Sequence, residues 1–309
     1  MSHHEMHKPL VVIIGPTCVG KTKTSIYLAE RLNGEIISAD SRTFYKGMDI
    51  GTAKPSIEEM QRVPHHLVDI VSPDNQLNLV VFQQLARSTI AEIYSRDHIP
   101  FLVGGTGQYI RSVTKNWSPP TAAPDHHLRQ VLEDISAVKG NEYLYQVLKF
   151  LDPEAAAIID LRNVRRTIRA IEVIFKTGKL FSLQRQANTS QYDLITIGLT
   201  RSRIELYSRI DQRIEDMFSK GFVQEVRILL NSGLSPYLPA FSAIGYPECI
   251  AVVSGRITEE EAIKEIKRKT RIFVRRQANW FKPTDPTIEW FDISKRSGFE
   301  IEDFIRSSL

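Results

Sequence analysis

The stretch GPTCVGKT at residues 15–22 constrains the fold of this chain more than any other feature. It fits the pattern G-x-x-x-x-G-K-[ST], in which loop amides and a helix N-terminus converge on phosphate oxygens. Such a loop needs a buried strand before it and a helix after it. The apolar run PLVVII (9–14) precedes it, and the sequence at 21–34 is typical of a helix closed by Gly34. We therefore expect a phosphate-binding α/β protein.

The loop predicts a role for each of its residues. Lys21 should reach the outer phosphate, and the Thr22 hydroxyl should bind Mg²⁺. Cys18 lies near a helix N-terminus, where a thiol pKa can be lowered, although a small residue with a useful backbone N–H is the simpler interpretation. The predicted phosphate ligands are Gly15, Pro16, Thr17, Cys18, Val19, Gly20, Lys21 and Thr22.

The rest of the chain alternates between strand-like and helix-like segments. Short apolar runs predict strands at 35–40, 66–71, 99–104, 192–199 and 288–294, and periodic stretches predict helices at 79–97, 202–231 and 256–282. This alternation predicts a P-loop NTPase-like parallel sheet with right-handed crossovers.

One long helical stretch interrupts this alternation. After NWSPPTAAP (116–124), residues 125–188 show no convincing strand, and a strand pattern resumes at 192–199. A helical excursion between strands of one sheet predicts an insertion. We expect a core domain formed by 1–124 and 190–309, and an inserted helical domain at 125–189 that contacts the partner.

Composition and charge limit the partner and the compartment. With 42% hydrophobic and 25% charged residues and no apolar run near the ~20 residues of a membrane span, a soluble protein without a membrane partner is expected. The N-terminus lacks a secretory signal, and Cys18 and Cys249 cannot form a disulfide framework, which predicts a cytoplasmic protein. Net charge is only +4, but 161–170 holds four arginines and 267–276 six basic residues. These clusters favour a polyanionic partner over merely solvated helix faces.

The carboxylates argue against an ordinary P-loop kinase or ATPase. Such enzymes hold Mg²⁺ with an Asp at a strand end, and Asp40 and Asp69 are available. The most apolar strand, however, ends in GGTG around Thr106 without a carboxylate, and no arginine finger stands out. Asp40 is placed to act as a base at the carboxyl end of its strand. Its alternative roles are a helix N-cap or an indirect Mg²⁺ ligand.

Several longer motifs add a family resemblance. GPTCVGKT is followed by ISADSRTFYKGMDIGTAKP (37–55), PHHLVDIVSP (64–73), LVGGTGQYI (102–110), RRTIRAIEV (165–173), SAIGYPE (242–248) and TRIFVRRQANWF (270–281). In this order they resemble the tRNA dimethylallyltransferase, or tRNA isopentenyltransferase, family over about 10–282. The absence of a Cys/His zinc-finger tail favours the bacterial type.

The resemblance implies a reaction and a set of substrates. A dimethylallyl group would pass from dimethylallyl diphosphate to N6 of adenosine 37, beside the tRNA anticodon, with release of diphosphate and help from Mg²⁺. The P-loop would hold the donor diphosphate, Lys21 would neutralise its charge, and Thr22 would contact the metal. Because the adenine must leave the anticodon loop stack, binding energy from the basic clusters would offset the cost of extrusion.

The resemblance also implies which residues meet the tRNA and the transferred group. Asp40 would accept the proton of the adenine amine, and Thr106 would lie beside the transferring group. His65 and His66 lack further metal ligands and are interpreted as structural or pocket-lining. The implied tRNA contacts are Asp40, Ser41, Arg42, Thr43, Thr106, Arg129, Arg165, Arg166, Thr167, Ile168 and Arg169, with 242–247 as a further stretch.

Three other functions stay open at this point. An adenylate isopentenyltransferase would use a free nucleotide and would need neither the basic clusters nor the helical insertion. A small-molecule P-loop kinase would bind ATP at the same loop. A non-catalytic RNA-binding protein would have no use for Asp40 and Thr106 beside an intact P-loop. We expect a monomer.

Overall fold

The computed structural model describes residues 8–117, 120, 122–184 and 189–309. Most of the N-terminal stretch on which the expectation of no secretory signal rests lies outside these residues. The chain divides into two compact units, one formed by residues 1–114 and 190–309 and the other by residues 115–189. Among the described residues, no helix combines the length and apolar character needed to cross a bilayer.

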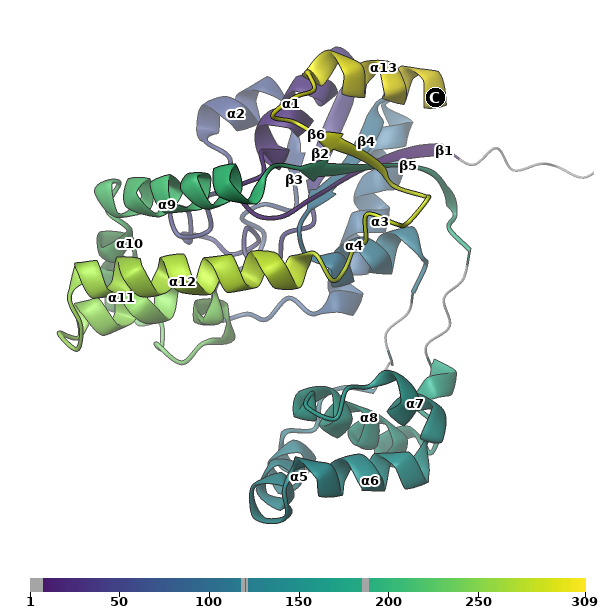
Figure 1. Ribbon diagram of the computed structural model, residues 1–309, viewed down its shortest axis with the longest axis vertical. Helices are drawn as coiled ribbons and strands as arrows, with labels where there is room; N and C mark the ends of the chain where they lie inside the picture. The colour runs from purple at the N-terminus through teal and green to yellow at the C-terminus, as the bar shows by residue number, and fades with distance from the viewer. Residues whose placement is uncertain (1–7, 118–119, 121, 185–188) are drawn as a thin grey trace, which may run out of the picture. The chain divides into compact units, whose positions relative to one another are not determined.

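A parallel β-sheet forms the centre of the first unit (Figure 1). Within the described residues its strand order is β3-β2-β4-β1-β5-β6, and every neighbouring pair is parallel. The predicted P-loop-like α/β fold with a parallel sheet is therefore confirmed. The strands are β1 (Lys8–Ile14), β2 (Gly34–Ser38), β3 (His65–His66), β4 (Ile99–Gly104), β5 (Tyr192–Thr200) and β6 (Glu289–Asp292).

Both faces of the sheet are buried, which explains the continuous apolar run of β1. Val11 and Ile13 belong to one hydrophobic core, and Leu10, Val12 and Ile14 to the other. Successive side chains of a strand point to opposite faces, so helices must pack against each face of the sheet. Helices α1 (Lys21–Arg31) and α13 (Gly298–Ser308) supply residues to the first core, and α3 (Leu79–Ser95) and α4 (Gly107–Thr114) to the second.

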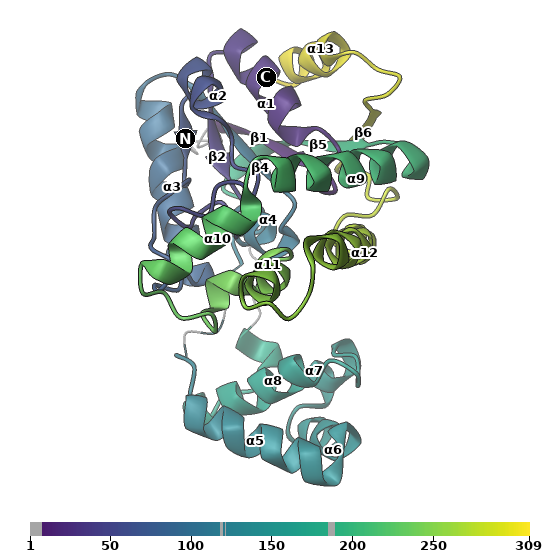
Figure 2. The same cartoon turned by 90° about the vertical axis from the view of Figure 1, so that its left-hand side faces the viewer.

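Helices α9 to α12 form a layer of their own in this unit (Figure 2). Three aromatic rings pack together among these helices. The ring centroid of Tyr246 lies 5.1 Å from that of Phe222 and 5.8 Å from that of Phe241. The short helix α2 (Ile57–Arg62) begins with a capping box at Ser56. The bounds of the layer are α9 (Arg203–Ser219), α10 (Phe222–Asn231), α11 (Tyr246–Val253) and α12 (Glu259–Gln277).

The second unit is helical and has a separate hydrophobic core. Leu144 and Leu148 of one helix pack with Ile168 and Ile171 of another, and all four side chains are buried. Such a core allows an inserted segment to hold its own shape. The helices are α5 (His126–Lys139), α6 (Asn141–Leu151), α7 (Pro153–Ile158) and α8 (Val164–Thr177).

Two local predictions were wrong. Helix α1 ends at Arg31, and Asn33, with φ 52°, makes the left-handed turn that was assigned to Gly34. Gly34 instead begins β2, where an added Cβ would lie 2.3 Å from the Phe101 ring. The expected strand at 66–71 keeps only its first residue in β3, because Leu67 and Asp69 adopt φ of 58° and 55°.

Candidate active site

The phosphate-binding loop follows β1 and turns directly into α1. Gly20 stands at the N-cap of α1 with φ 119° and ψ 17°, a conformation that a residue with a Cβ rarely adopts. The first-turn amides of α1 therefore point out of the loop without a side-chain cap. A helix N-terminus presented in this way attracts anions.

The side chain of Lys21 folds back over the loop. Its Nζ donates to the carbonyl oxygens of Gly15, at 3.0 Å, and Pro16, at 2.9 Å. Burial lowers the pKa of Lys21 to about 8, although the Asp40 carboxylate acts in the opposite direction. A lysine poised in this way can pair with an incoming diphosphate.

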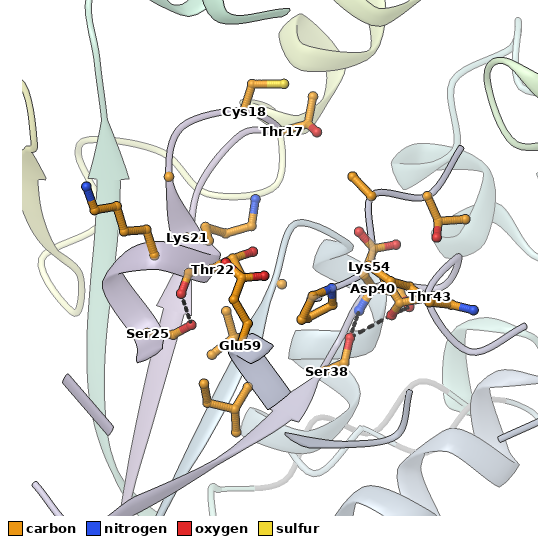
Figure 3. Close-up of a pocket in the computed structure, with 18 of the residues that line it drawn as sticks. Thr17, Cys18, Lys21, Thr22, Ser25, Ser38, Asp40, Thr43, Lys54 and Glu59 are labelled. Atoms are coloured by element: carbon orange, nitrogen blue, oxygen red, sulfur yellow. Dashed lines mark hydrogen bonds between the residues drawn. The ribbon is translucent and has the colours of Figure 1, made fainter. Parts of the chain in front are cut away.

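Asp40 follows the carboxyl end of β2 and is fixed by local hydrogen bonds (Figure 3). Its Oδ1 accepts the Arg42 backbone N–H at 3.0 Å, and its own N–H donates to Ser38 Oγ at 3.3 Å. The hydroxyls of Ser38 and Thr43 lie 2.8 Å apart. Asp40 held in this way lines the cavity beside the P-loop.

A cavity of about 530 Å³ brings many of the predicted residues together. Its wall includes Thr17, Cys18, Gly20, Lys21 and Thr22 from the loop, and Asp40 and Thr43 from the end of β2. Ser41, Arg42 and Thr106 lie outside this lining. Arg42 donates to the carbonyl oxygens of Pro239 and Ala240, both at 3.4 Å, and to Ser242 Oγ at 3.2 Å. Thr106 begins the turn into α4, where its carbonyl oxygen accepts the Tyr109 N–H.

Two arginines of α9 line the cavity beside the P-loop and were missed from the sequence. Arg209 Nε donates to the Cys18 carbonyl oxygen at 2.9 Å. Arg213 donates to the Thr52 carbonyl oxygen at 3.4 Å and lies 3.7 Å from the Cys18 sulfur. Both line the cavity. Their spacing of four residues places both guanidinium groups on one helix face, but this spacing does not reveal that the face meets the loop.

A tightly held loop forms another wall, also missed. Thr52 and Lys54 line the cavity. Lys54 Nζ donates to the Tyr45 carbonyl oxygen and to Asp49, each at 2.6 Å, and also pairs with Asp69. The loop's preceding backbone N–H groups, at 49–51, all donate to the Glu225 carboxylate of α10 at 2.6 to 3.2 Å.

The oxygen atoms in this cavity fit a magnesium ion bound together with a phosphate ester. Mg²⁺ keeps several waters and takes one or two protein oxygens plus substrate phosphates. Thr22 and Asp40, which carry a hydroxyl and a carboxylate, both line this space. No cluster of three or more His, Cys, Asp or Glu suited to a metal occurs among the described residues. His65 Nδ1 donates to the Val63 carbonyl oxygen at 2.8 Å, and His66 Nε2 lies 2.6 Å from the Glu35 carboxylate.

The predicted tRNA contacts of the helical unit differ in exposure. Arg129 and Arg169 both donate to Glu172, whose side chain is fully buried. Thr167 and Ile168 are buried in the core of this unit, with 1% and 4% of their surface exposed. Arg165 is exposed and Arg166 partly so. Within the 165–169 stretch Arg165 is therefore exposed, while Arg166 and Arg169 are partly buried.

Comparison with known proteins identifies the relatives of this chain. The family model described as IPP transferase matches residues 43–284, and one described as isopentenyl transferase matches residues 8–69. A tRNA dimethylallyltransferase of Roseiflexus sp. is 49% identical over 89% of this chain and 90% of its own. One from Alkaliphilus metalliredigens is 44% identical over 98% of both chains.

Solved structures show the same similarity. The tRNA isopentenylpyrophosphate transferase of Bacillus halodurans superposes with a TM-score of 0.73 at 42% identity, covering 98% of this chain and 96% of the other. A eukaryotic dimethylallyltransferase, described as acting on tRNA, gives a TM-score of 0.80 at 26% identity over 97% of this chain and 77% of its own.

Proposed function

Because this chain belongs to the tRNA dimethylallyltransferase family, we propose that its P-loop cavity binds dimethylallyl diphosphate and presents it to an adenine of tRNA. The chain is a prenyltransferase enzyme that modifies tRNA by transferring a dimethylallyl group. The proposal assigns the donor, the acceptor atom and the roles of individual residues. The acceptor atom we assign is N6 of adenosine 37.

The donor diphosphate is assigned to the end of the cavity where positive charge gathers. Lys21, Arg209 and Arg213 all line it, beside the first-turn amides of α1. Diphosphate leaves easily once cations and N–H groups share its negative charge. The phosphates therefore belong at the P-loop, with the dimethylallyl carbon directed toward Asp40.

Asp40 is assigned the proton of the adenine amine. N6 forms a bond to C1 of the dimethylallyl group while the bond from C1 to the diphosphate oxygen breaks, and the electron pair leaves with diphosphate. The N6 proton passes to the Asp40 carboxylate and then to solvent. The carboxylate also stabilises positive charge that develops on N6. Thr106 is assigned a place beside the transferring group.

Mg²⁺ is the metal that the oxygen donors of this site would suit. Thr22 would hold it through its hydroxyl, with waters completing the coordination. When bound, the ion would supply neutralisation of the diphosphate charge.

The tRNA is assigned to Asp40 through Thr43 in the core unit and to Arg165 and Arg166 in the helical unit. The exposed Arg165 supports this assignment, because guanidinium groups at a surface bind phosphates. Arg129 and Arg169 contribute to the same surface chiefly by holding the unit together around Glu172. Thr167 and Ile168 contribute through packing.

We propose that the protein acts in the cytoplasm, and its tRNA substrate supports this location. We also propose a monomer, since the P-loop, Asp40, Arg209 and Arg213 line one cavity of a single chain. That shared cavity is the observation on which the whole proposal depends.

The proposal is tested by measuring which acceptor, tRNA or a free nucleotide, receives a radiolabelled dimethylallyl group. The purified chain is incubated with radiolabelled dimethylallyl diphosphate, Mg²⁺ and unmodified tRNA, and in parallel with AMP or ATP in place of tRNA. Label should enter tRNA at adenosine 37 and should be absent from the free nucleotides. Label in AMP or ATP alone would show an adenylate isopentenyltransferase. Transfer of phosphate from labelled ATP would show a kinase.

A further inference from the structure

The end of α12 packs against the turn that carries Thr106. A Cβ added to Gly105 would lie 2.4 Å from Gln277 Nε2, and one added to Gly107 would lie 2.4 Å from the Trp280 ring. Gly105 and Gly107, the two neighbours of Thr106, are therefore both covered by side chains of the segment 277–280. Arg111 strengthens this contact, because its guanidinium stacks 5.4 Å from the Trp280 ring centroid and donates to the Trp280 carbonyl oxygen at 2.5 Å.

Gln277 also reaches the P-loop. Its Oε1 accepts the Thr17 backbone N–H at 2.9 Å, while its Nε2 donates to the Gly105 carbonyl oxygen at 3.2 Å. The carboxamide thus uses its acceptor for one segment and its donor for the other. A side-chain amide is planar and rigid, so two such bonds fix the separation of the segments they join.

We propose that Gln277 is a positioning residue for prenyl transfer, which holds the P-loop at a fixed separation from the turn that carries Thr106. The proposal rests on the function assigned above, because the two segments matter to the reaction only if one holds the diphosphate and the other borders the transferring group. Gln277 itself acts through Thr17 and Gly105.

The required accuracy explains why such a bridge is useful. The two segments follow β1 and β4, which pair as far as Ile14 and Gly104. Within the described residues the β1–β4 pairing ends there. A displacement of about 1 Å between a bound reactant and its catalytic groups can cost about 100-fold in rate. Gln277 supplies a side-chain constraint where the backbone constraint ends.

Variants of Gln277 separate its two bonds. Gln277→Met keeps the length of the side chain and removes both donor and acceptor. Gln277→Glu keeps the acceptor for the Thr17 N–H but places a carboxylate against the Gly105 carbonyl oxygen. Gln277→Asn keeps the amide but is one methylene too short to span both partners. The matched control is Gln224→Met, the same change at an exposed glutamine of α10.

The measurements distinguish positioning from binding and from folding. Each full-length variant is assayed by single turnover with saturating dimethylallyl diphosphate and tRNA, with the rate expressed per folded molecule. The Kd for tRNA and the thermal unfolding midpoint are measured on the same samples. We expect Gln277→Met and Gln277→Glu to lower the single-turnover rate by about 10- to 100-fold. The tRNA Kd should stay within about twofold, and Gln224→Met should match the wild type.

Three results would overturn the proposal. Gln277→Met could turn over at the wild-type rate, or all three variants could lose only tRNA affinity, which would make Gln277 a tRNA contact. Alternatively, total activity could fall only as far as the amount of folded protein falls, with the rate per folded molecule unchanged. In each case the wild-type chain still prenylates tRNA, so these results are distinct from failure of the proposed function, in which the wild type leaves tRNA unlabelled.

Discussion

Arg129 donates two hydrogen bonds, each 2.9 Å long, to the fully buried carboxylate of Glu172. The same carboxylate accepts the Asp125 backbone N–H at 2.6 Å and a bond from Arg169 at 2.5 Å. Arg169 in turn donates to the Ala122 carbonyl oxygen at 2.7 Å. Glu172 therefore ties the start of α5 to α8 and to the segment that leads into the helical unit.

Removing one arginine from this group should destabilise the protein. Arg129→Met leaves a buried carboxylate with fewer partners, and we expect a loss of about 3 kcal/mol in the free energy of unfolding. Urea unfolding followed by circular dichroism measures it. Arg165→Met, at an exposed site of the same unit, should change stability by less than about 0.5 kcal/mol. Equal stability of the two variants would contradict a structural role for Arg129.

The exposed Arg165 should instead affect how tRNA binding responds to salt. Arg165→Met is expected to weaken tRNA binding and to lower the slope of log Kd against log salt concentration by about 1, because one phosphate contact is lost. Filter binding at several salt concentrations gives this slope. A slope equal to that of the wild type would remove Arg165 from the interface.

Asp40 should matter for the chemical step and little for binding. Asp40→Ala removes the group that takes the N6 proton, so we expect kcat to fall by about 100- to 10,000-fold. The tRNA Kd should remain within about threefold, because the backbone and hydroxyls around Asp40 stay in place. Single-turnover kinetics and a binding assay on the same protein check both values. Wild-type turnover in this variant would exclude Asp40 as the base.

Lys21 should make diphosphate binding depend on pH. Its pKa of about 8 means that the ammonium is present below that pH and is lost above it. The affinity for inorganic diphosphate should therefore fall as pH rises through about 8, and binding near that pH should take up a proton. Calorimetry in two buffers of different ionisation enthalpy measures the uptake. Lys21→Met should bind at least about tenfold more weakly at neutral pH and show neither effect.

The carboxylate of Glu35 should govern stability in acid. Hydrogen bonds from Arg96, and then from His66 and His98, hold the pKa of Glu35 at about 2, below its ordinary 4.5. Because the folded pKa is the lower one, this contribution is complete above about pH 4.5 and disappears as the pH falls toward 2. Urea midpoints across that range should fall steeply for the wild type and less steeply for Glu35→Gln. Parallel curves would show that Glu35 does not control acid stability.

The part of the site next to the P-loop could be predicted from sequence, because a local motif determines it. The loop pattern specifies a strand, a turn and a helix in a row, and Asp40 follows the next strand along the chain. Arg209 and Gln277 could not be found in this way. They contact the loop from 191 and 260 residues away, and neither spacing nor composition reports contacts over such distances.

The failed strand at 66–71 has a local physical cause. Its apolar residues form a short run typical of a strand, but Asp69 and Ile70 donate their backbone N–H groups to the carbonyl oxygens of Thr43 and Phe44. The segment therefore pairs with a loop whose course the sequence pattern does not reveal. The same pairing helps to hold the wall of the cavity that contains Thr43.

The position of β5 beside β1 has a consequence for synthesis of the chain. β1 precedes the P-loop and pairs with β4 on one edge and with β5 on the other. Residues 115–189 must leave the ribosome before the partner of that second edge exists. Until then the nascent protein exposes an apolar strand edge of the kind that promotes aggregation. A helical segment that completes its own core during this interval shortens the flexible loop between β4 and β5. This lowers the entropy cost of pairing β5 with β1.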